Sequence, residues 1–170
     1  MKTKSILAIL LSLALTACGT TSTTTTPPSP APVLSSVDSA IEASLPLIRT
    51  GAAVATGAVL DFAVNQASTR TRLANEMYSA ANAVYSLTSG TFPTPAQFQS
   101  NIMAWGGSQA DASYASFSTA IAGLYSSYYP KLTSGASTQT AVDLLGAIAA
   151  GIQDATASYV TTPAPATGSN

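Results

Sequence analysis

Few side chains in this sequence of 170 residues could carry reaction chemistry, and its single thiol is the most distinctive of them. Cys18 is the only cysteine, and there is no histidine, so the commonest general base and metal ligand is missing from the sequence. With one cysteine, a disulfide within the chain is impossible. The residues around Cys18 must therefore indicate what its thiol does.

Catalysis by a pair of carboxyl groups would need two acidic residues to meet in a pocket. The candidates are Asp38, Glu42, Asp61, Glu76, Asp111, Asp143 and Asp154. Asp38 and Glu42 are four residues apart, so we expect a solvated pair on one helix face. We expect Asp111 and Asp143 in first helical turns, where a carboxylate faces the helix dipole. No Gly-x-Ser-x-Gly, phosphate-binding loop or His-Glu-x-x-His is present. We therefore predict a non-enzymatic protein with no cofactor and no metal.

The chain begins with a three-part pattern that ends at the cysteine. Met1–Ser5 contains two lysines and no acid, and Ile6–Leu15 is apolar apart from Ser12. The residues Leu15-Thr16-Ala17-Cys18 follow, and then Gly19. A charged start, a short apolar run and small residues at a cleavage point are typical of a secretory signal peptide. The apolar run is too short for a permanent membrane span, which needs about 20 residues.

The four residues Leu15-Thr16-Ala17-Cys18 resemble the lipobox of bacterial lipoproteins. This resemblance implies transfer of diacylglycerol to the Cys18 thiol, cleavage between Ala17 and Cys18, and often acylation of the new amino group. Two or three acyl chains give stable membrane anchoring, whereas one binds only marginally. The expected partner is therefore a membrane, reached through the lipid on Cys18. The alternative is an ordinary signal peptide with an incidental cysteine.

The residue after the cysteine indicates a location within the cell envelope. In Gram-negative lipoproteins Asp at this position retains the protein at the inner membrane, whereas this chain has Gly19. The resemblance therefore implies the periplasmic face of the outer membrane. In a Gram-positive host the same anchor would lie on the outer face of the cytoplasmic membrane, and the sequence does not identify the host.

Two segments lack the apolar residues that a folded core requires. Residues 19–32 read GTTSTTTTPPSPAP, without charge or a large apolar side chain. Such a segment cannot offset its ordering entropy, so we predict a disordered spacer of roughly 40 Å. The predicted domains are the signal peptide 1–17, the lipidated cysteine and Thr/Pro-rich tether 18–33, a helical domain 34–160 and a disordered tail 161–170.

Apolar residues recur at helical spacing throughout residues 34–160. Pro46 interrupts the first stripe, so we expect a kink or a helix break just before it. Thr94-Pro95-Ala96-Gln97 is a capping box, and its helix should end at Gly106-Gly107. We expect other helices to end at Gly90 and Pro130, and others to begin at Ser108–Asp111 and at Thr140 with Asp143. The predicted fold is all-α: an antiparallel bundle of four long helices and one short helix, with short loops.

Small residues on the predicted helix faces suggest close packing of helix axes. Gly51, Gly57, Gly146 and Gly151 should allow closer approach than leucine would, and this must offset about 1 kcal/mol of helix propensity at each. A membrane-inserted helix is the alternative, but the longest apolar runs are too short to span. We expect Trp105 to plug one end of the bundle. Crowded tyrosines at positions 125, 128 and 129 are core residues or an aromatic rim for a partner.

The charge pattern excludes one class of partner. Only 8% of residues are charged, and removal of Lys2 and Lys4 with the leader leaves a net charge near −3. Nucleic-acid binding needs clustered basic residues, so we predict none. Arg70 and Arg72 stand together and could contact anionic groups, but solubility alone accounts for two charges.

Three functions fit these observations. The first is a membrane-anchored periplasmic or cell-surface lipoprotein with a non-catalytic helical domain, which is structural or binds another envelope protein. The second is a helical module with an apolar cavity for a hydrophobic ligand. The third is a phage- or prophage-encoded envelope lipoprotein that acts in lysis or in exclusion of other phages.

Overall fold

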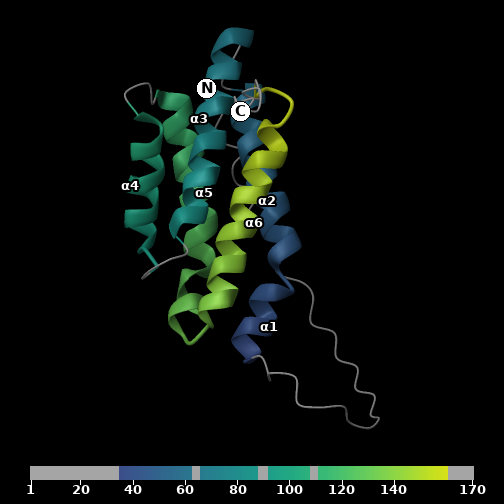
Figure 1. Cartoon of the computed structure of the whole chain (residues 1–170), viewed down its shortest axis with the longest axis vertical. Coiled ribbons are helices and arrows are strands. Elements are labelled where there is room, and N and C mark those ends of the chain that lie inside the picture. The colour runs from purple at the N-terminus through teal and green to yellow at the C-terminus, as the bar shows by residue number, and fades with distance from the viewer. Residues whose placement is uncertain (1–34, 63–65, 88–91, 108–110, 161–170) are drawn as a thin grey trace, which may run out of the picture. The chain divides into compact units, whose positions relative to one another are not determined.

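The structure is a computed structural model that describes residues 35–62, 66–87, 92–107 and 111–160. Six helices and no strand lie within these ranges (Figure 1): α1 (Ser36–Glu42), α2 (Leu45–Phe62), α3 (Ala67–Ser86), α4 (Pro95–Trp105), α5 (Ala112–Thr133) and α6 (Thr138–Thr156). The all-α prediction is confirmed for this part of the chain. The number of helices differs from the predicted five, because the first predicted helix is two separate ones.

The break between α1 and α2 falls just before Pro46, as predicted. The Ser44 N–H donates to the Ile41 carbonyl at 2.8 Å, and the Ile48 N–H donates to the Ser44 carbonyl at 2.9 Å. Pro46 lies in the first turn of α2, where a backbone N–H has no intrahelical partner to lose. One apolar stripe thus continues through two helices.

The capping box of α4 is confirmed by its hydrogen bonds. The Thr94 hydroxyl accepts from the Gln97 N–H at 3.3 Å, and the Gln97 side chain accepts from the Thr94 N–H at 2.9 Å. The helix ends at Trp105 with Gly106 as its cap, and Trp105 is half-buried there. Local sequence is sufficient here, because both partners lie within one turn.

Two predicted helix ends are wrong. The cap of α6 is Ser137, whose hydroxyl accepts from the Thr140 N–H at 3.1 Å, so Thr140 and Asp143 lie inside the helix. Pro130 does not close α5, which continues to Thr133 and buries Leu132. Only the last turn of α5 follows Pro130. In that turn the Ser134 N–H donates a hydrogen bond to the Pro130 carbonyl at 3.1 Å.

Other predicted ends are partly or wholly outside the described residues. Asp111 caps α5 and accepts from the N–H groups of Ser113 and Tyr114, while Ser108 lies outside the described residues. The predicted stop at Gly90 also lies outside them, as do the signal peptide, Cys18, the tether and the tail.

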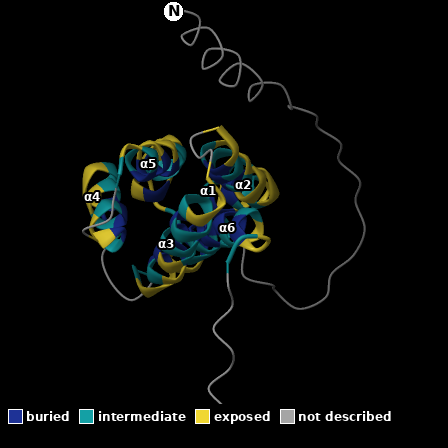
Figure 2. Cartoon of the chain, turned by 90° about the horizontal axis from the view of Figure 1, so that it is seen from above, coloured by how far each residue is buried: buried dark blue, intermediate teal, exposed yellow. Residues whose placement is uncertain are grey.

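The helices from α2 onward form a ring when seen end-on (Figure 2), in the order α2, α6, α3, α4, α5. Contacts between α4 and α5 pair Gln99 with Thr119 and Ile102 with Tyr114, so these helices are antiparallel. In contrast, α2 and α6 are parallel, because Arg49 pairs with Asp154 and Asp61 with Tyr159. The prediction of an antiparallel bundle therefore fails for this helix pair.

Most of the core lies on the apolar stripes that the periodicity predicts, but Phe62, the last residue expected in the first stripe, is 88% exposed, and Leu60 is buried instead. The largest side chains that are fully buried include Tyr114, Tyr125, Phe98, Phe117, Ile41, Ile48, Leu60, Leu73, Met77, Ile102, Ile121 and Leu144. Burial of such side chains contributes about 1.5 to 3 kcal/mol each. Hydrophobic burial by these residues therefore stabilises the bundle.

Close packing at a glycine is confirmed at one of the four predicted positions. A Cβ atom on Gly151 would overlap the Arg49 carbonyl and crowd Ala52, so α2 and α6 approach closely there. Additional Cβ atoms at Gly51 and Gly146 would make ordinary contacts, and one at Gly57 would meet open space. Gly151 therefore fixes the separation of the two parallel helices.

Candidate functional site

The carboxylates singled out from the sequence do not form a pair. Asp38 is buried rather than solvated, and its oxygens accept from the Ser137 N–H at 2.7 Å and the Ser35 hydroxyl at 2.8 Å. The Ser137 N–H, followed by the Thr140 and Ser35 hydroxyls, lowers the pKa of Asp38 well below its usual value. The expected surface pair with Glu42 is therefore wrong, and Asp38 is structural.

The two arginines near the start of α3 are engaged within the domain. Arg72 donates to Glu76 at 2.6 Å and to Asp111 at 2.9 Å. The guanidinium of Arg70 lies 5.6 Å from the centroid of the Tyr159 ring. The expectation that these charges serve only solubility is therefore too simple, because both join α3 to other elements.

The tyrosines near the end of α5 divide into core and boundary positions. Tyr125 is fully buried, stacks on Phe98 with centroids 4.3 Å apart and donates to the Pro93 carbonyl at 2.8 Å. Burial raises the pKa of Tyr125 to about 12. Tyr128 and Tyr129 are half-buried. Tyr125 thus belongs to the core, and only Tyr128 and Tyr129 could contribute to an aromatic rim.

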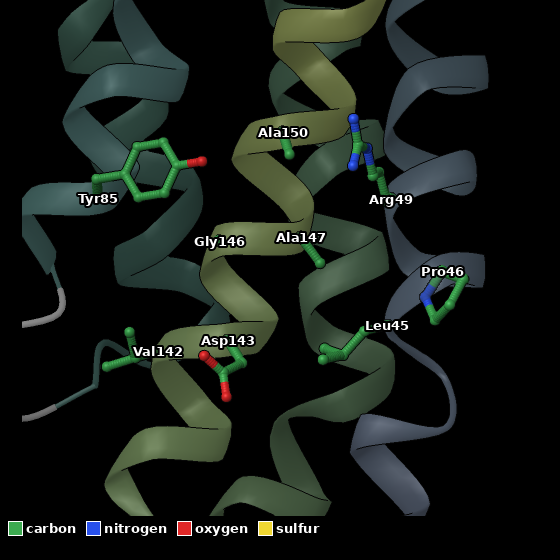
Figure 3. A pocket seen from close by; sticks show the side chains of 9 residues that line it. All are labelled: Leu45, Pro46, Arg49, Tyr85, Val142, Asp143, Gly146, Ala147 and Ala150. Atoms are coloured by element: carbon green, nitrogen blue, oxygen red, sulfur yellow. The ribbon is translucent and has the colours of Figure 1, made fainter.

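The most distinct surface feature is an open groove of about 570 Å³ along α6 (Figure 3). Its floor is made of small residues, namely Gly146, Ala147 and Ala150. Tyr85 of α3 lies on one side of α6 and Arg49 of α2 on the other, and in Figure 3 their polar ends point toward each other. The groove thus combines an apolar floor with polar groups at its edges.

A second open groove, of about 380 Å³, follows further along the same two parallel helices. Its lining includes Ala53 and Gly57 from α2, and Ala155 from α6. Two carboxylates, Asp61 and Asp154, also line it. We call the two depressions together the α6 groove.

An ion pair lies between the two depressions, because Arg49 lines the first and Asp154 lines the second. The Arg49 Nε and Nη2 groups donate to both oxygens of Asp154, at 2.7 and 3.0 Å. The hydrogen bond from Arg49 lowers the pKa of Asp154. Both side chains are about half exposed, so this pair contributes little to stability. It fixes the position of two charges on the surface instead.

The sequence does not predict this groove. Of the floor residues, only Gly146 stands out in the sequence, as a small packing position. The groove depends on contact of α6 with α2 and α3, which lie far from it in sequence, so no local spacing reveals it. The only available signal was the run of small residues on the outward side of α6.

The described part of the chain contains no candidate metal centre and one candidate membrane span. Within it, no group of three or more acidic side chains is arranged to hold a metal ion. One described helix, α2, is long and apolar enough to cross a membrane by length and composition alone. It packs against α6 and α5 in the bundle, and it carries Arg49 and Asp61.

No protein family, curated protein or solved structure matches this chain.

Proposed function

We propose that this chain is a lipoprotein of the bacterial cell envelope, anchored by lipid on Cys18, whose helical domain is structural or binds another envelope protein without catalysing a reaction. The observation that carries the proposal is the motif Leu15-Thr16-Ala17-Cys18 directly after the apolar run Ile6–Leu15. Thiol acylation would consume the only thiol of the chain. The membrane would be the outer one, on its periplasmic face, in a Gram-negative host.

The surface of the domain supports protein binding over storage of a hydrophobic ligand. Both depressions of the α6 groove are open to solvent, and no phenylalanine lines them. A ligand-binding cavity typically encloses most of the ligand surface among large apolar side chains. An open groove with a floor of small residues is better suited to receive side chains from a macromolecular partner.

Metabolic labelling with a fatty acid, followed by detergent phase separation, tests the anchor. The chain should incorporate label and enter the detergent phase, whereas Cys18→Ser should do neither. Thr24→Ser, a conservative change in the tether, serves as the matched control and should behave as the unaltered chain. Label that persists in the Cys18→Ser variant would refute the proposal.

A further inference from the structure

We infer that the α6 groove is the docking surface for a helical segment of another protein, one that presents an apolar ridge with a basic residue near each end. This inference rests on the proposed function, because it identifies where the helical domain would bind its envelope partner. It is carried by the shape of the groove and by the charges at its two ends.

The shape fits a ridge of side chains from a helix. The floor residues Gly146, Ala147, Ala150 and Ala155 have at most a methyl side chain. Leu45, Pro46 and Tyr85 line the first depression. Helices pack by inserting side-chain ridges into such grooves, and an amphipathic helix in an apolar groove is a recurrent mode of recognition.

The charges at the ends of the groove favour a basic partner. Asp143 lines one end and accepts from the Gln139 amide at 2.8 Å. Asp61 lines the other end and accepts from the Tyr159 hydroxyl at 3.4 Å. Both donors are neutral groups, so neither carboxylate is neutralised by them. The positive charge of Arg49, between the ends, is already paired with Asp154.

The two ends of the α6 groove should differ in how strongly they attract a basic residue. Arg70 lies against the ring of Tyr159, so a positive charge is close to the Asp61 end. The Asp143 end should therefore contribute more to binding. Leu45 of α2 lines the first depression together with Asp143, and Asp61 is sixteen residues further along α2, so at 1.5 Å per residue the two ends are roughly 24 Å apart. A partner helix would span this distance in about sixteen residues.

The same charges argue against the two other occupants of an apolar surface. A second copy of the chain that docked through the same groove would bring its own Asp61 and Asp143 to the contact, and like charges repel. An anionic lipid surface would meet the same carboxylates. A basic segment of a different protein is the occupant with complementary charge.

Peptide binding to the purified lipidated chain in detergent tests this inference. The probe is a fluorescent alanine- and leucine-rich helical peptide with lysines about sixteen residues apart, and its twin has glutamates there. Fluorescence anisotropy should show the lysine peptide binding at least about ten-fold more tightly. The double variant Asp61→Asn with Asp143→Asn should remove most of this preference without altering the core.

Filling the groove provides the second arm of the experiment. Ala150→Leu should weaken binding of the lysine peptide, whereas Ala120→Leu, an exposed site on α5 outside the groove, should not. Equal binding of the two peptides, or equal effects of the two leucines, would overturn the inference. Self-association that Ala150→Leu abolishes would overturn it in favour of a second copy. The lipid is measured separately by mass on the same sample, so failure of the anchor is distinguishable from failure of the groove.

Discussion

The carboxylate of Asp38 accepts a hydrogen bond from the backbone N–H of Ser137 at 2.7 Å, although the two residues are 99 positions apart. Asp38 belongs to the short helix α1, and Ser137 is the cap of α6. The bond therefore ties the first described helix to the start of the last one. It also explains why a charged side chain can be buried at this point.

Loss of this bond should destabilise the domain. Asp38→Ala leaves the Ser137 N–H without its acceptor and removes a partner of the Ser35 hydroxyl. We expect the melting temperature to fall by about 5 °C or more. Asp38→Asn keeps one carbonyl oxygen that can accept a hydrogen bond, so its melting temperature should fall less. Thermal unfolding followed by circular dichroism measures both variants. Equal melting of Asp38→Ala and the unaltered chain would show that the bond is unimportant.

The pH dependence of stability should be confined to the acidic and alkaline extremes. The folded-state pKa values of Asp38, Asp111 and Asp154 are lowered, so their contribution is present above their unfolded values near 4 and is lost as pH falls further. The chain has no histidine. Denaturant unfolding should therefore give constant free energies between about pH 5.5 and 8.5. A transition near pH 6.5 would contradict this account.

The alkaline limb should depend on Tyr114 and Tyr125, because burial raises the pKa of both. The folded-state pKa of Tyr125 is about 12, above the unfolded value, so its contribution is present below about pH 10 and is lost as pH rises through the folded value. Tyr125→Phe also leaves the buried Pro93 carbonyl without its donor, at a cost of about 1 kcal/mol. Tyr129→Phe, at a half-buried site, should cost less in the same denaturant titration. The reverse order of the two variants would argue against the hydrogen bond.

Substitution by alanine should change the stability of the domain in opposite directions at Gly151 and at Gly57. Gly151→Ala forces a Cβ atom against the Arg49 carbonyl, so we expect a loss of about 2 kcal/mol or more as α2 and α6 separate. Gly57→Ala places its methyl group in open space and should gain about 0.5 to 1 kcal/mol from helix propensity. Calorimetric melting of both variants measures the contrast. A similar effect at both sites would mean that close helix packing at Gly151 is not required.

The features that the sequence predicted correctly are those determined within one helical turn. The capping box at Thr94, the break before Pro46 and the stop at Gly106 all involve neighbouring residues. The apolar stripes were also predictable, because burial follows helical periodicity. Asp143 shows the limit of predictions from local sequence. Its sequence context resembles the start of a helix, but the N-cap of α6 is Ser137, so the helix begins earlier than predicted.

The features that the sequence did not predict depend on contacts between distant segments. The parallel pairing of α2 with α6 depends on which helices become neighbours in the folded bundle, and the periodicity within each helix does not indicate this. The burial of Asp38 requires a partner in another helix, which periodicity within α1 cannot reveal. The α6 groove combines Arg49, Tyr85 and Asp143 from three helices, so only the assembled structure brings them together.

The most direct test of the central claim is the intact mass and amino-terminal sequence of the mature protein purified from its native membrane. The account predicts a chain that begins at Cys18, lacks residues 1–17 and carries acyl mass on that cysteine. A chain with a free thiol at Cys18, or with its leader still attached, would contradict it.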